Sequence, residues 1–153
     1  MMNLKCIAGL DPGISGAIAF YFPDQPKLIS AYDIPSVNKE INASELYDLI
    51  KKYDPDLIIV EHVHAFRGQG VSSSFNFGNH YGVAKGVIGS AKIPVHFVAP
   101  TKWKRYFGLS SDKEQSRALA ISTWPFSDHF RRKKDNGRAE AALLALYGAK
   151  TQL

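Results

Sequence analysis

Residues 10–20 read LDPGISGAIAF, and this stretch sets the frame for the rest of the chain. It joins an apolar run over 4–10 to a second apolar run over 16–22, with Asp11-Pro12-Gly13 between them as a turn signal. After a second turn, rich in proline, a third run covers 28–33. Three short strands joined by tight turns predict an antiparallel meander at the start of the fold.

Beyond residue 40 the chain alternates between helical and strand patterns. Apolar residues over 43–53 fall near helical spacing, with Asn42 or Ser44 as a cap. The continuous apolar run LIIV over 57–60 fits a strand that is buried on both faces. The pattern also predicts a loop and a small-residue helix over 68–89, a strand over 95–98, and helices over 113–124 and 138–149.

This order of elements predicts the fold class. Antiparallel strands followed by strands that alternate with helices indicate an α/β protein with a mixed five-stranded sheet flanked by helices. Three strands would be antiparallel and the next two parallel, which is the order of ribonuclease H-like folds. Because one fold can host many functions, the functional prediction has to come from the site.

The composition excludes several classes of protein. With 153 residues, 45% of them hydrophobic, the chain fits one globular domain over 1–153 and not a disordered protein. No apolar run approaches the roughly 20 residues that cross a bilayer, so we expect no membrane partner. Cys6 is the only cysteine, which excludes an internal disulfide and a zinc site built on cysteines. No signal peptide is recognisable before the first strand, so we expect a cytoplasmic protein.

Positive charge is concentrated in one quarter of the chain. The formal net charge is +5, and residues 101–138 hold ten lysines and arginines against four acids, so the remainder sums to −1. Such segregation is typical of a protein that binds a polyanion, although a solvated basic face would have the same composition. The basic residues of this segment are Lys102, Lys104, Arg105, Lys113, Arg117, Arg131, Arg132, Lys133, Lys134 and Arg138.

Three carboxylates stand where elements of the fold should meet. Asp11 ends the first apolar run and Glu61 ends the run LIIV, and the ligands of α/β sheets gather beyond the carboxyl ends of strands. Glu140 precedes Leu144 and Tyr147 by four and seven residues, which puts it on the apolar stripe of the last helix. A carboxylate buried there is costly unless a metal ion or a basic partner compensates its charge.

Each acid also has an ordinary interpretation. Asp11 suits a turn, and Glu61 suits a surface charge or an ion pair with a neighbouring histidine. Glu140 suits the edge of its stripe, paired with a nearby cation. Asp135, just ahead of the last helix, suits an N-cap or a partner of the helix dipole. The coincidence of two strand ends with an apolar helix face nevertheless favours a shared site.

Oxygen ligands of this kind fit hard divalent cations. Mg²⁺ is usually bound by one or two carboxylates together with phosphate and water. Two metal ions about 4 Å apart can activate a water and stabilise the leaving oxygen of an in-line phosphate displacement. No side chain stands out as a protein nucleophile, so we predict metal-dependent phosphodiester hydrolysis with Mg²⁺, for which Mn²⁺ would substitute.

Four segments resemble, in order, the motifs of RuvC-type Holliday junction resolvases in their short, phage-type form. LDPGISGAIAF resembles the first strand, turn and second strand of that family, and LIIVEHV resembles its fourth strand. VAPTKWKRYFGLSSDKEQSRALAISTWP resembles the segment after the fifth strand, and KKDNGRAEAALLALYG resembles the closing acidic helix. The resemblance covers nearly the whole chain and implies a ribonuclease H-like nuclease of a bacterial or phage-infected cell.

The resemblance implies that Asp11, Glu61, Asp135 and Glu140 are catalytic and form the metal site. Glu140 stands where aspartate is more usual in the family, and Asp135 precedes it by five residues instead of about three. Residues five apart do not share a helix face, so Asp135 has to reach in from ahead of the helix, or another group takes its role. A catalytic role is also implied for Lys113, which lies at a helix start, where a cation is unfavourable.

DNA contacts are expected from the basic segment and from residues 62–78, HVHAFRGQGVSSSFNFG. In the family this region faces the junction and leads into the helix that forms the dimer, so a side chain here would act as a wedge in the crossover. Phe75 and Phe77 are expected in the core or at a dimer interface, and Trp103 and Trp124 in the core. The residues assigned to DNA are His64, Phe66, Arg67, Lys102, Lys104, Arg105, Arg131, Arg132, Lys133 and Lys134, with Phe66 or His64 as the wedge.

The predicted function is resolution of Holliday junctions, with forks as a further substrate, by a homodimer whose two-fold symmetry matches that of a four-way junction. Each site would hydrolyse one phosphodiester and leave a 5′-phosphate and a 3′-hydroxyl. A YqgF-type ribonuclease and a non-catalytic junction-binding protein are the alternatives. A nucleotide-binding fold of the sugar kinase and actin type also begins with Asp-x-Gly, but it needs two such domains.

Overall fold

The described part of the chain, residues 3–151 of a computed structural model, is built around one five-stranded sheet. Its strands are β1 (Ile7–Asp11), β2 (Ala17–Tyr21), β3 (Ile29–Asp33), β6 (Leu57–Glu61) and β7 (Val95–Val98), in the order β3-β2-β1-β6-β7. The first three are antiparallel, whereas β6 runs parallel to β1 and β7 parallel to β6. The mixed sheet predicted from the sequence is confirmed.

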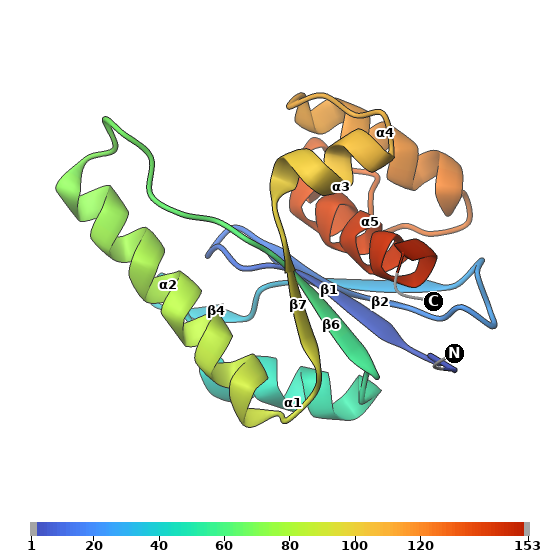
Figure 1. Cartoon of the computed structure of the whole chain (residues 1–153), viewed down its shortest axis with the longest axis horizontal. Coiled ribbons are helices and arrows are strands. Elements are labelled where there is room, and N and C mark those ends of the chain that lie inside the picture. Colours follow the sequence, from blue (N-terminus) through green and yellow to red (C-terminus); the bar gives the residue numbers. More distant parts are fainter. Residues whose placement is uncertain (1–2, 152–153) are drawn as a thin grey trace.

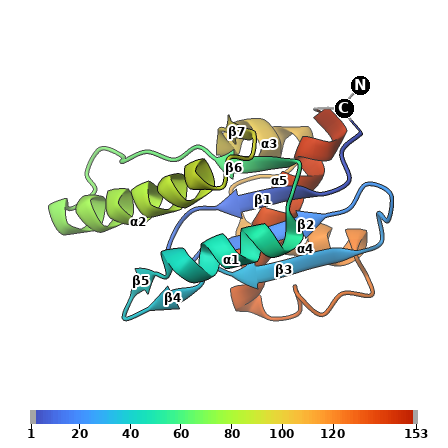
Figure 2. The ribbon, with the colours of Figure 1, turned by 90° about the horizontal axis from the view of Figure 1, so that it is seen from below.

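Helices cover both faces of this sheet (Figures 1 and 2). One face carries α1 (Ala43–Tyr53) and α2 (Val71–Ser90), and the other carries α3 (Pro100–Tyr106), α4 (Lys113–Thr123) and α5 (Asn136–Thr151). A 3₁₀ turn, Lys133–Asp135, leads directly into α5, and a hairpin of β4 (Ser36–Val37) and β5 (Glu40–Ile41) lies between β3 and α1. Within residues 3–151, no helix has both the length and the apolar character needed to cross a membrane.

The strands divide their side chains between two cores. In β1, Ile7 belongs to the core under α5, whereas Ala8 and Leu10 belong to the core under α1 and α2. In β6, Ile59 belongs to the first core and Ile58 to the second. Because successive side chains of a strand point to opposite faces, a continuous apolar run becomes a strand buried on both sides, as predicted for 57–60.

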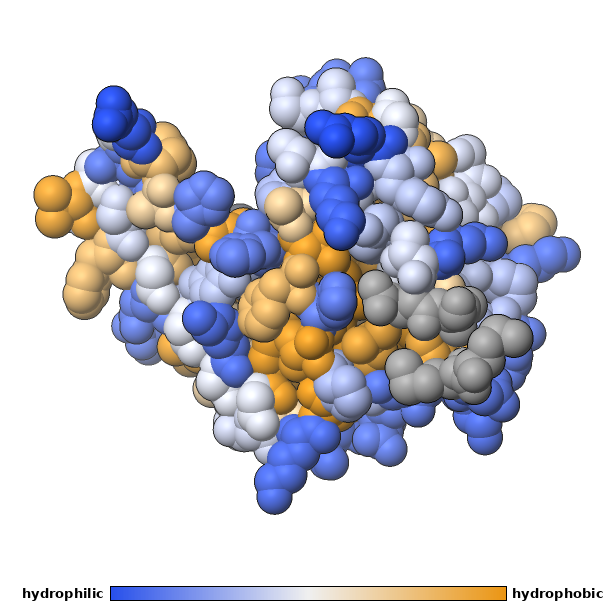
Figure 3. Space-filling model, in the orientation of Figure 1, coloured by the Kyte–Doolittle hydropathy of each residue, from blue (hydrophilic) through white to orange (hydrophobic). Residues whose placement is uncertain are grey.

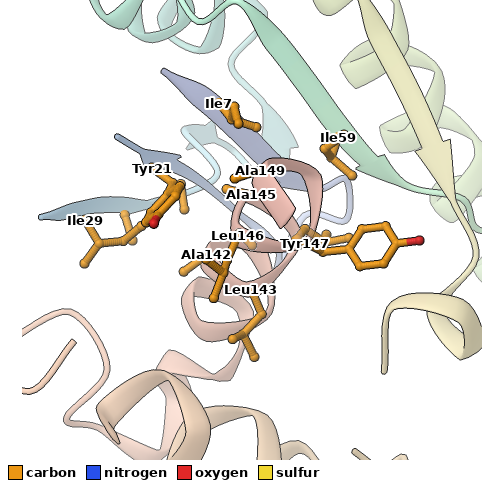
Figure 4. Packing of buried hydrophobic residues seen from close by; sticks show 14 of the residues in the cluster. Ile7, Tyr21, Ile29, Ile59, Ala142, Leu143, Ala145, Leu146, Tyr147 and Ala149 are labelled. Atoms are coloured by element: carbon orange, nitrogen blue, oxygen red, sulfur yellow. The ribbon is translucent and has the colours of Figure 1, made fainter. Parts of the chain in front are cut away.

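Helix α5 lies very close to the sheet and organises the first core. Figure 4 shows its side chains packed against Ile7, Tyr21 and Ile59. At the crossing with β1 stands Gly9, where a Cβ would overlap the backbone of Ala141 and Ala145 in α5. Because Gly9 has no side chain, the backbone of α5 can approach β1 this closely. The close contact holds the beginning of α5 over the carboxyl end of β1.

Helix α2 is anchored at one end only. Its second half packs onto the body through Ala84, Val87 and Ile88, while its first half projects past the sheet (Figure 1). Phe75 in the projecting half is 75% exposed, so placing it in the core of the chain is wrong, and the dimer contact remains the alternative. We call the loop 62–70 and the first half of α2 the arm.

Three short elements are absent from the prediction because their local signals are weak. The β4–β5 hairpin has two residues per strand and turns through Asn38 and Lys39 without a glycine. Helix α3 has only seven residues, and its one clear signal is Pro100 at the first helical position. The 3₁₀ turn before α5 has only three residues, and α5 begins at Asn136, two residues earlier than the predicted helix over 138–149. Two of these elements, α3 and the 3₁₀ turn, carry residues of the candidate site.

Candidate active site

Two carboxylates lie side by side at the carboxyl ends of neighbouring parallel strands. Asp11 is the last residue of β1 and Glu61 the last of β6, one position beyond the paired residues Leu10 and Val60. Glu140 joins them from α5, where it is buried with 4% of its surface exposed. The turn after Asp11 packs against the start of α5 at Gly137, one helical turn before Glu140. The sheet and α5 thus converge on one site, as the sequence predicts for these three acids.

Burial and neighbouring negative charge raise the proton affinity of Asp11 and Glu61. Burial raises the pKa of Asp11 to about 7, and the charges of Glu61 and Glu140 act in the same direction. Burial also raises the pKa of Glu61, and the charge of Glu140 adds to the effect. The positive charge of Lys113 acts in the opposite direction and lowers the pKa of Asp11. The site therefore holds more negative charge than its surroundings compensate, which favours a bound cation.

Two lysines supply part of the missing positive charge. The Nζ of Lys104 lies 3.3 Å from Oε2 of Glu140, and the Nζ of Lys113 lies 3.5 Å from Oε1. Lys104 comes from α3 and also lies over the ring of Trp103, with 5.5 Å between its Nζ and the ring centroid. Lys113 is the first residue of α4, and the pairing with Glu140 accounts for a cation at that helix start. The basic partner that a buried Glu140 requires is present.

Trp103 has a polar role that the sequence reasoning missed. It is fully buried, which confirms its placement in the core, and its Nε1 donates a hydrogen bond of 2.9 Å to Oε2 of Glu61. This bond lowers the pKa of Glu61 against the effect of burial. The sequence offered only a general indication of this bond, namely that the N–H of a buried tryptophan needs a hydrogen-bond acceptor.

Asp135 is engaged elsewhere. It is almost fully buried and accepts hydrogen bonds from the backbone N–H of Arg132, at 2.8 Å, and from its guanidinium, at 2.9 Å. Burial opposes ionisation of Asp135, but the hydrogen bonds and charge of Arg132 outweigh it and lower the pKa. Asp135 is not among the charges that shift Asp11 or Glu61. Asp135 therefore bonds back to the start of the 3₁₀ turn and is not the N-cap suggested from the sequence, and these contacts do not bring it to the other three acids.

The donor chemistry fits a hard divalent cation, but the ligands are not assembled around one. Within residues 3–151 no three His, Cys, Asp or Glu side chains are arranged to hold a metal ion. The crowded oxygen atoms of Asp11, Glu61 and Glu140 are nevertheless the ligands that Mg²⁺ prefers. Since Glu140 is held by both lysines, metal binding at all three acids would require Lys104 and Lys113 to release it at least in part.

Most of the basic residues predicted to contact DNA are exposed. Arg131 forms an ion pair of 2.6 Å with Asp128, and because both side chains are exposed this pair is weak and leaves Arg131 available. Arg132 is held by Asp135, although half of its side chain is exposed. Of the residues assigned to DNA contact, those that are exposed and make no ion pair within 3–151 are Arg67, Lys102, Arg105, Lys133 and Lys134.

The arm and the α3–α4 side enclose a notch above the strand ends. β6 runs into the loop that leads to α2, and β7 runs into α3, so the carboxyl ends of these strands lie between the two sides (Figure 1). The space-filling view shows the hollow between the arm and the α3–α4 side (Figure 3). His64 and Phe66 lie on the arm, and Phe66 is 68% exposed. Both predicted wedge residues are therefore exposed on the arm.

Solved structures of other proteins have a fold similar to that of this chain. No protein-family model and no curated protein sequence matches the chain at a significant level. Solved structures do match it, among them Thermus thermophilus RuvC in complex with a Holliday junction substrate, with 14% identity, a TM-score of 0.64 and 95% of each chain covered. Fowlpox virus resolvase with its substrate junction has 19% identity, a TM-score of 0.58, and coverage of 97% of this chain and 99% of that one.

A third match is the yeast mitochondrial Holliday junction resolvase Ydc2, with 13% identity and a TM-score of 0.55 over 92% of this chain and 77% of that one. At such low identities the likeness is one of fold. It agrees with the strand order, in which three antiparallel strands are followed by two parallel ones. The chain has the ribonuclease H-like fold of RuvC and of other Holliday junction resolvases.

Proposed function

We propose that this chain is a metal-dependent endonuclease that resolves Holliday junctions and related branched DNA. The observation that carries the proposal is the convergence of Asp11, Glu61 and Glu140 at the strand ends, with two lysines beside them. Structures of the same fold include two that contain junction DNA, RuvC and the fowlpox virus resolvase. An uncompensated carboxylate cluster next to cationic side chains suits a phosphodiester substrate.

Mg²⁺, with Mn²⁺ as its substitute, is the proposed cofactor, held by Asp11, Glu61 and Glu140. When bound, such ions neutralise phosphate charge and favour in-line attack by water. Asp135 was predicted as a fourth ligand, and in our proposal it instead fixes Arg132 and the turn that begins α5. Trp103 keeps the carboxylate of Glu61 in one orientation by donating to a single oxygen.

Lys104 and Lys113 would exchange partners when substrate arrives. In the free protein both ammonium groups lie against Glu140. A scissile phosphate with its cations would compete for these lysines, and their charge would then stabilise the extra negative charge of the transition state. The chain's contribution to catalysis is therefore to position carboxylates and lysines around one phosphodiester, whose hydrolysis leaves a 5′-phosphate and a 3′-hydroxyl.

The exposed basic residues would hold the DNA duplexes that meet at the junction. Lys102 and Arg105 on α3, together with Lys133 and Lys134 on the 3₁₀ turn, are available for phosphate contacts. Such contacts fix position without reading sequence, and the affinity they provide falls as salt rises. On the opposite side of the notch, Phe66 would act as the wedge at the crossover, with His64 and Arg67 beside it.

A homodimer is part of the proposal, because two identical sites related by two-fold symmetry suit two like strands of a junction. The projecting half of α2 is the surface proposed for the contact. Phe75 is largely exposed there, and a Cβ added at Gly78 or Gly82 would meet no atom within 4 Å, so these glycines are not required for packing within the described chain. Small residues of this kind allow two helices to approach closely.

The test is cleavage of a labelled four-way DNA junction by the wild type and by Asp11→Asn and Glu61→Gln, in Mg²⁺ and in EDTA, with linear duplex as control. We expect paired, symmetric nicks that require metal and are lost in both variants. Preferential cleavage of structured RNA would favour the YqgF-type alternative. Tight junction binding without cleavage in Mg²⁺ or Mn²⁺ would favour a non-catalytic junction-binding protein.

A further inference from the structure

A groove of about 1030 Å³ lies next to the candidate site and has no role in the proposal so far. It is lined by the turn that follows Asp11, by the β4–β5 hairpin and by the projecting half of α2. Figure 2 shows α2 and the hairpin on the same side of the molecule. The groove is large and open, which suits a polymer chain passing through it better than an enclosed small molecule.

The tip of the hairpin carries a lysine in an unfavourable backbone conformation. Ser36 pairs with Ile41 and Val37 with Glu40, so Asn38 and Lys39 are the two turn residues, with φ of 51° and 63°. A two-residue turn with both φ values positive prefers Asn-Gly, because glycine has no Cβ to clash there. Asparagine tolerates the conformation, but lysine at the second position makes the hairpin less stable than glycine would. Folding of the hairpin therefore does not explain the lysine.

The groove borders the turn that connects it to the candidate active site. Gly13 and Ser15, which line it, belong to the turn that begins at Asp11, and the N–H of Gly16 closes that turn by donating to the carbonyl of Gly13 at 2.9 Å. A DNA strand whose scissile phosphate lies at Asp11 would therefore meet this groove within a short distance of the cleavage site.

The side chains of the groove suit a nucleic acid strand. Lys39 can contact a phosphate, and the amides of Asn76 and Asn79 can donate to and accept from sugars and bases. Glu40, the only carboxylate among the lining residues, follows Lys39 in the hairpin and leaves the groove with no strong overall charge. One cation among neutral amides fits a single phosphate contact and does not form a general basic patch.

From this arrangement we propose that Lys39 binds a backbone phosphate of the cleaved strand, close to the scissile phosphate, and that the strand continues through the groove along α2. The proposal rests on the proposed function, because the strand is defined by its cleavage at Asp11. It adds a contact on the hairpin side of the site, far along the chain from the basic segment 101–138.

The chain offers matched controls for the test. Lys92, at the end of α2, also has a positive φ, of 58°, and it is not among the lining residues of the groove. Lys92→Gly therefore removes the same charge and relieves the same backbone conformation outside the groove. Asn38→Gly relieves the conformation at the hairpin tip and keeps the lysine.

The experiment measures junction binding in EDTA, where cleavage is absent, over a series of salt concentrations. We expect Lys39→Gly to fold at least as stably as the wild type in urea denaturation. It should bind the junction roughly five-fold more weakly, with a salt slope smaller by about one, as for the loss of one phosphate contact. Lys92→Gly should bind within about two-fold of the wild type, and Asn38→Gly, which removes an amide that also lines the groove, should lose less affinity than Lys39→Gly and keep the salt slope of the wild type.

A neutral methylphosphonate placed at single positions flanking the cleavage site locates the contact. At one position it should weaken binding by the wild type but not by Lys39→Gly, which would couple the lysine to that phosphate. Equal affinities of Lys39→Gly and wild type, or an equal loss in Lys92→Gly, would overturn the inference. Failure of the wild type to prefer a junction over duplex would instead overturn the proposed function, and the two failures are distinguishable.

Discussion

Helices α5 and α2 are both rich in small residues, yet they use them in opposite ways. In α5, small residues meet the sheet: a Cβ at Gly148 would collide with Ile59, and the backbone near Ala141 leaves no space for a side chain at Gly9. In the projecting part of α2, a Cβ at Gly78 or Gly82 would meet nothing within 4 Å. Composition alone does not separate the two helices, because the difference arises only when each is docked on the sheet.

The difference assigns separate tasks to the two helices. α5 is packed so closely that it fixes Glu140 against the strand ends, so the site depends on its docking. α2 leaves a surface open on the other side of the notch, where DNA or a second copy of the chain can bind.

Gly9→Ala should break the docking of α5. The new Cβ would overlap backbone atoms of Ala141 and Ala145, which cannot move aside as a flexible side chain can. We expect a loss of about 3 kcal/mol or more in the free energy of unfolding, measured by urea denaturation. The matched change in the other helix, Gly82→Ala, should be neutral or stabilise by up to about 1 kcal/mol, because it raises helix propensity. Similar losses in both variants would remove the contrast between the helices.

Asp11→Asn should stabilise the metal-free protein, because burial raises the pKa of Asp11 and the charges of Glu61 and Glu140 add to the effect. The pKa of Asp11 is raised to about 7, so in EDTA, from about pH 4 to pH 7, the folded state holds a proton that the unfolded state releases. The free energy of unfolding of the wild type should therefore fall as pH rises through this interval and level off above it.

In Asp11→Asn this decline should be smaller, because the contribution of Asp11 is removed while the raised pKa of Glu61 remains, and at pH 8 the variant should be more stable by on the order of 2 kcal/mol. Chemical denaturation at several pH values measures both proteins. A variant that is less stable than the wild type at pH 8 would mean that the carboxylates are not crowded in the metal-free protein.

Trp103→Phe should weaken metal binding while leaving the fold intact. It removes the hydrogen bond to Glu61 and keeps an aromatic ring in the core. Partners that orient a metal ligand typically contribute about 10-fold or more in affinity, so the variant should need about 10-fold more Mg²⁺ in calorimetric titration. Trp124→Phe is the control, because its indole donates to the carbonyl of Pro26 and not to an acid of the site. Equal Mg²⁺ affinities of Trp103→Phe and wild type would show that the bond has no positioning role.

Gly82→Leu should leave the fold intact, because a Cβ at this position meets nothing within 4 Å. As for Gly82→Ala, its effect on unfolding should be neutral or stabilising by up to about 1 kcal/mol. If α2 forms the dimer contact, the larger side chain should shift the dissociation of the dimer to higher protein concentration in analytical ultracentrifugation. A dimer of unchanged affinity would place the interface on another surface.

Much of the fold follows from local sequence pattern. The strands β1, β6 and β7 and the helix α4 occur where apolar runs and helical spacing predict them. The positions of Asp11 and Glu61 follow as well, because strand ends fix side chains at an edge of the sheet. The exposure of Phe75 did not follow from the sequence. An aromatic residue in a helical pattern could equally lie in the core or at an interface, and only the structure shows that this part of α2 projects from the sheet.

Contacts between distant parts of the chain account for the remainder. Lys104 and Glu140 come together only because α3 and α5 pack on the same face of the sheet, and no spacing rule relates them. The bond from Trp103 to Glu61 joins residues 42 positions apart. For Asp135, helical spacing correctly excluded a shared face with Glu140, but it did not reveal Arg132 as the partner.

The most direct test of the account compares Glu140→Gln with Asp135→Asn in cleavage of a four-way junction in Mg²⁺. Both changes keep the shape of the side chain and remove one buried charge, and thermal melts and junction binding control for folding. If Glu140 and not Asp135 belongs to the metal site, Glu140→Gln should slow cleavage by about 1000-fold or more, as expected for several kcal/mol of lost transition-state stabilisation. Asp135→Asn should stay within about 10-fold of the wild type. An active Glu140→Gln beside an inactive, well-folded Asp135→Asn would contradict this assignment.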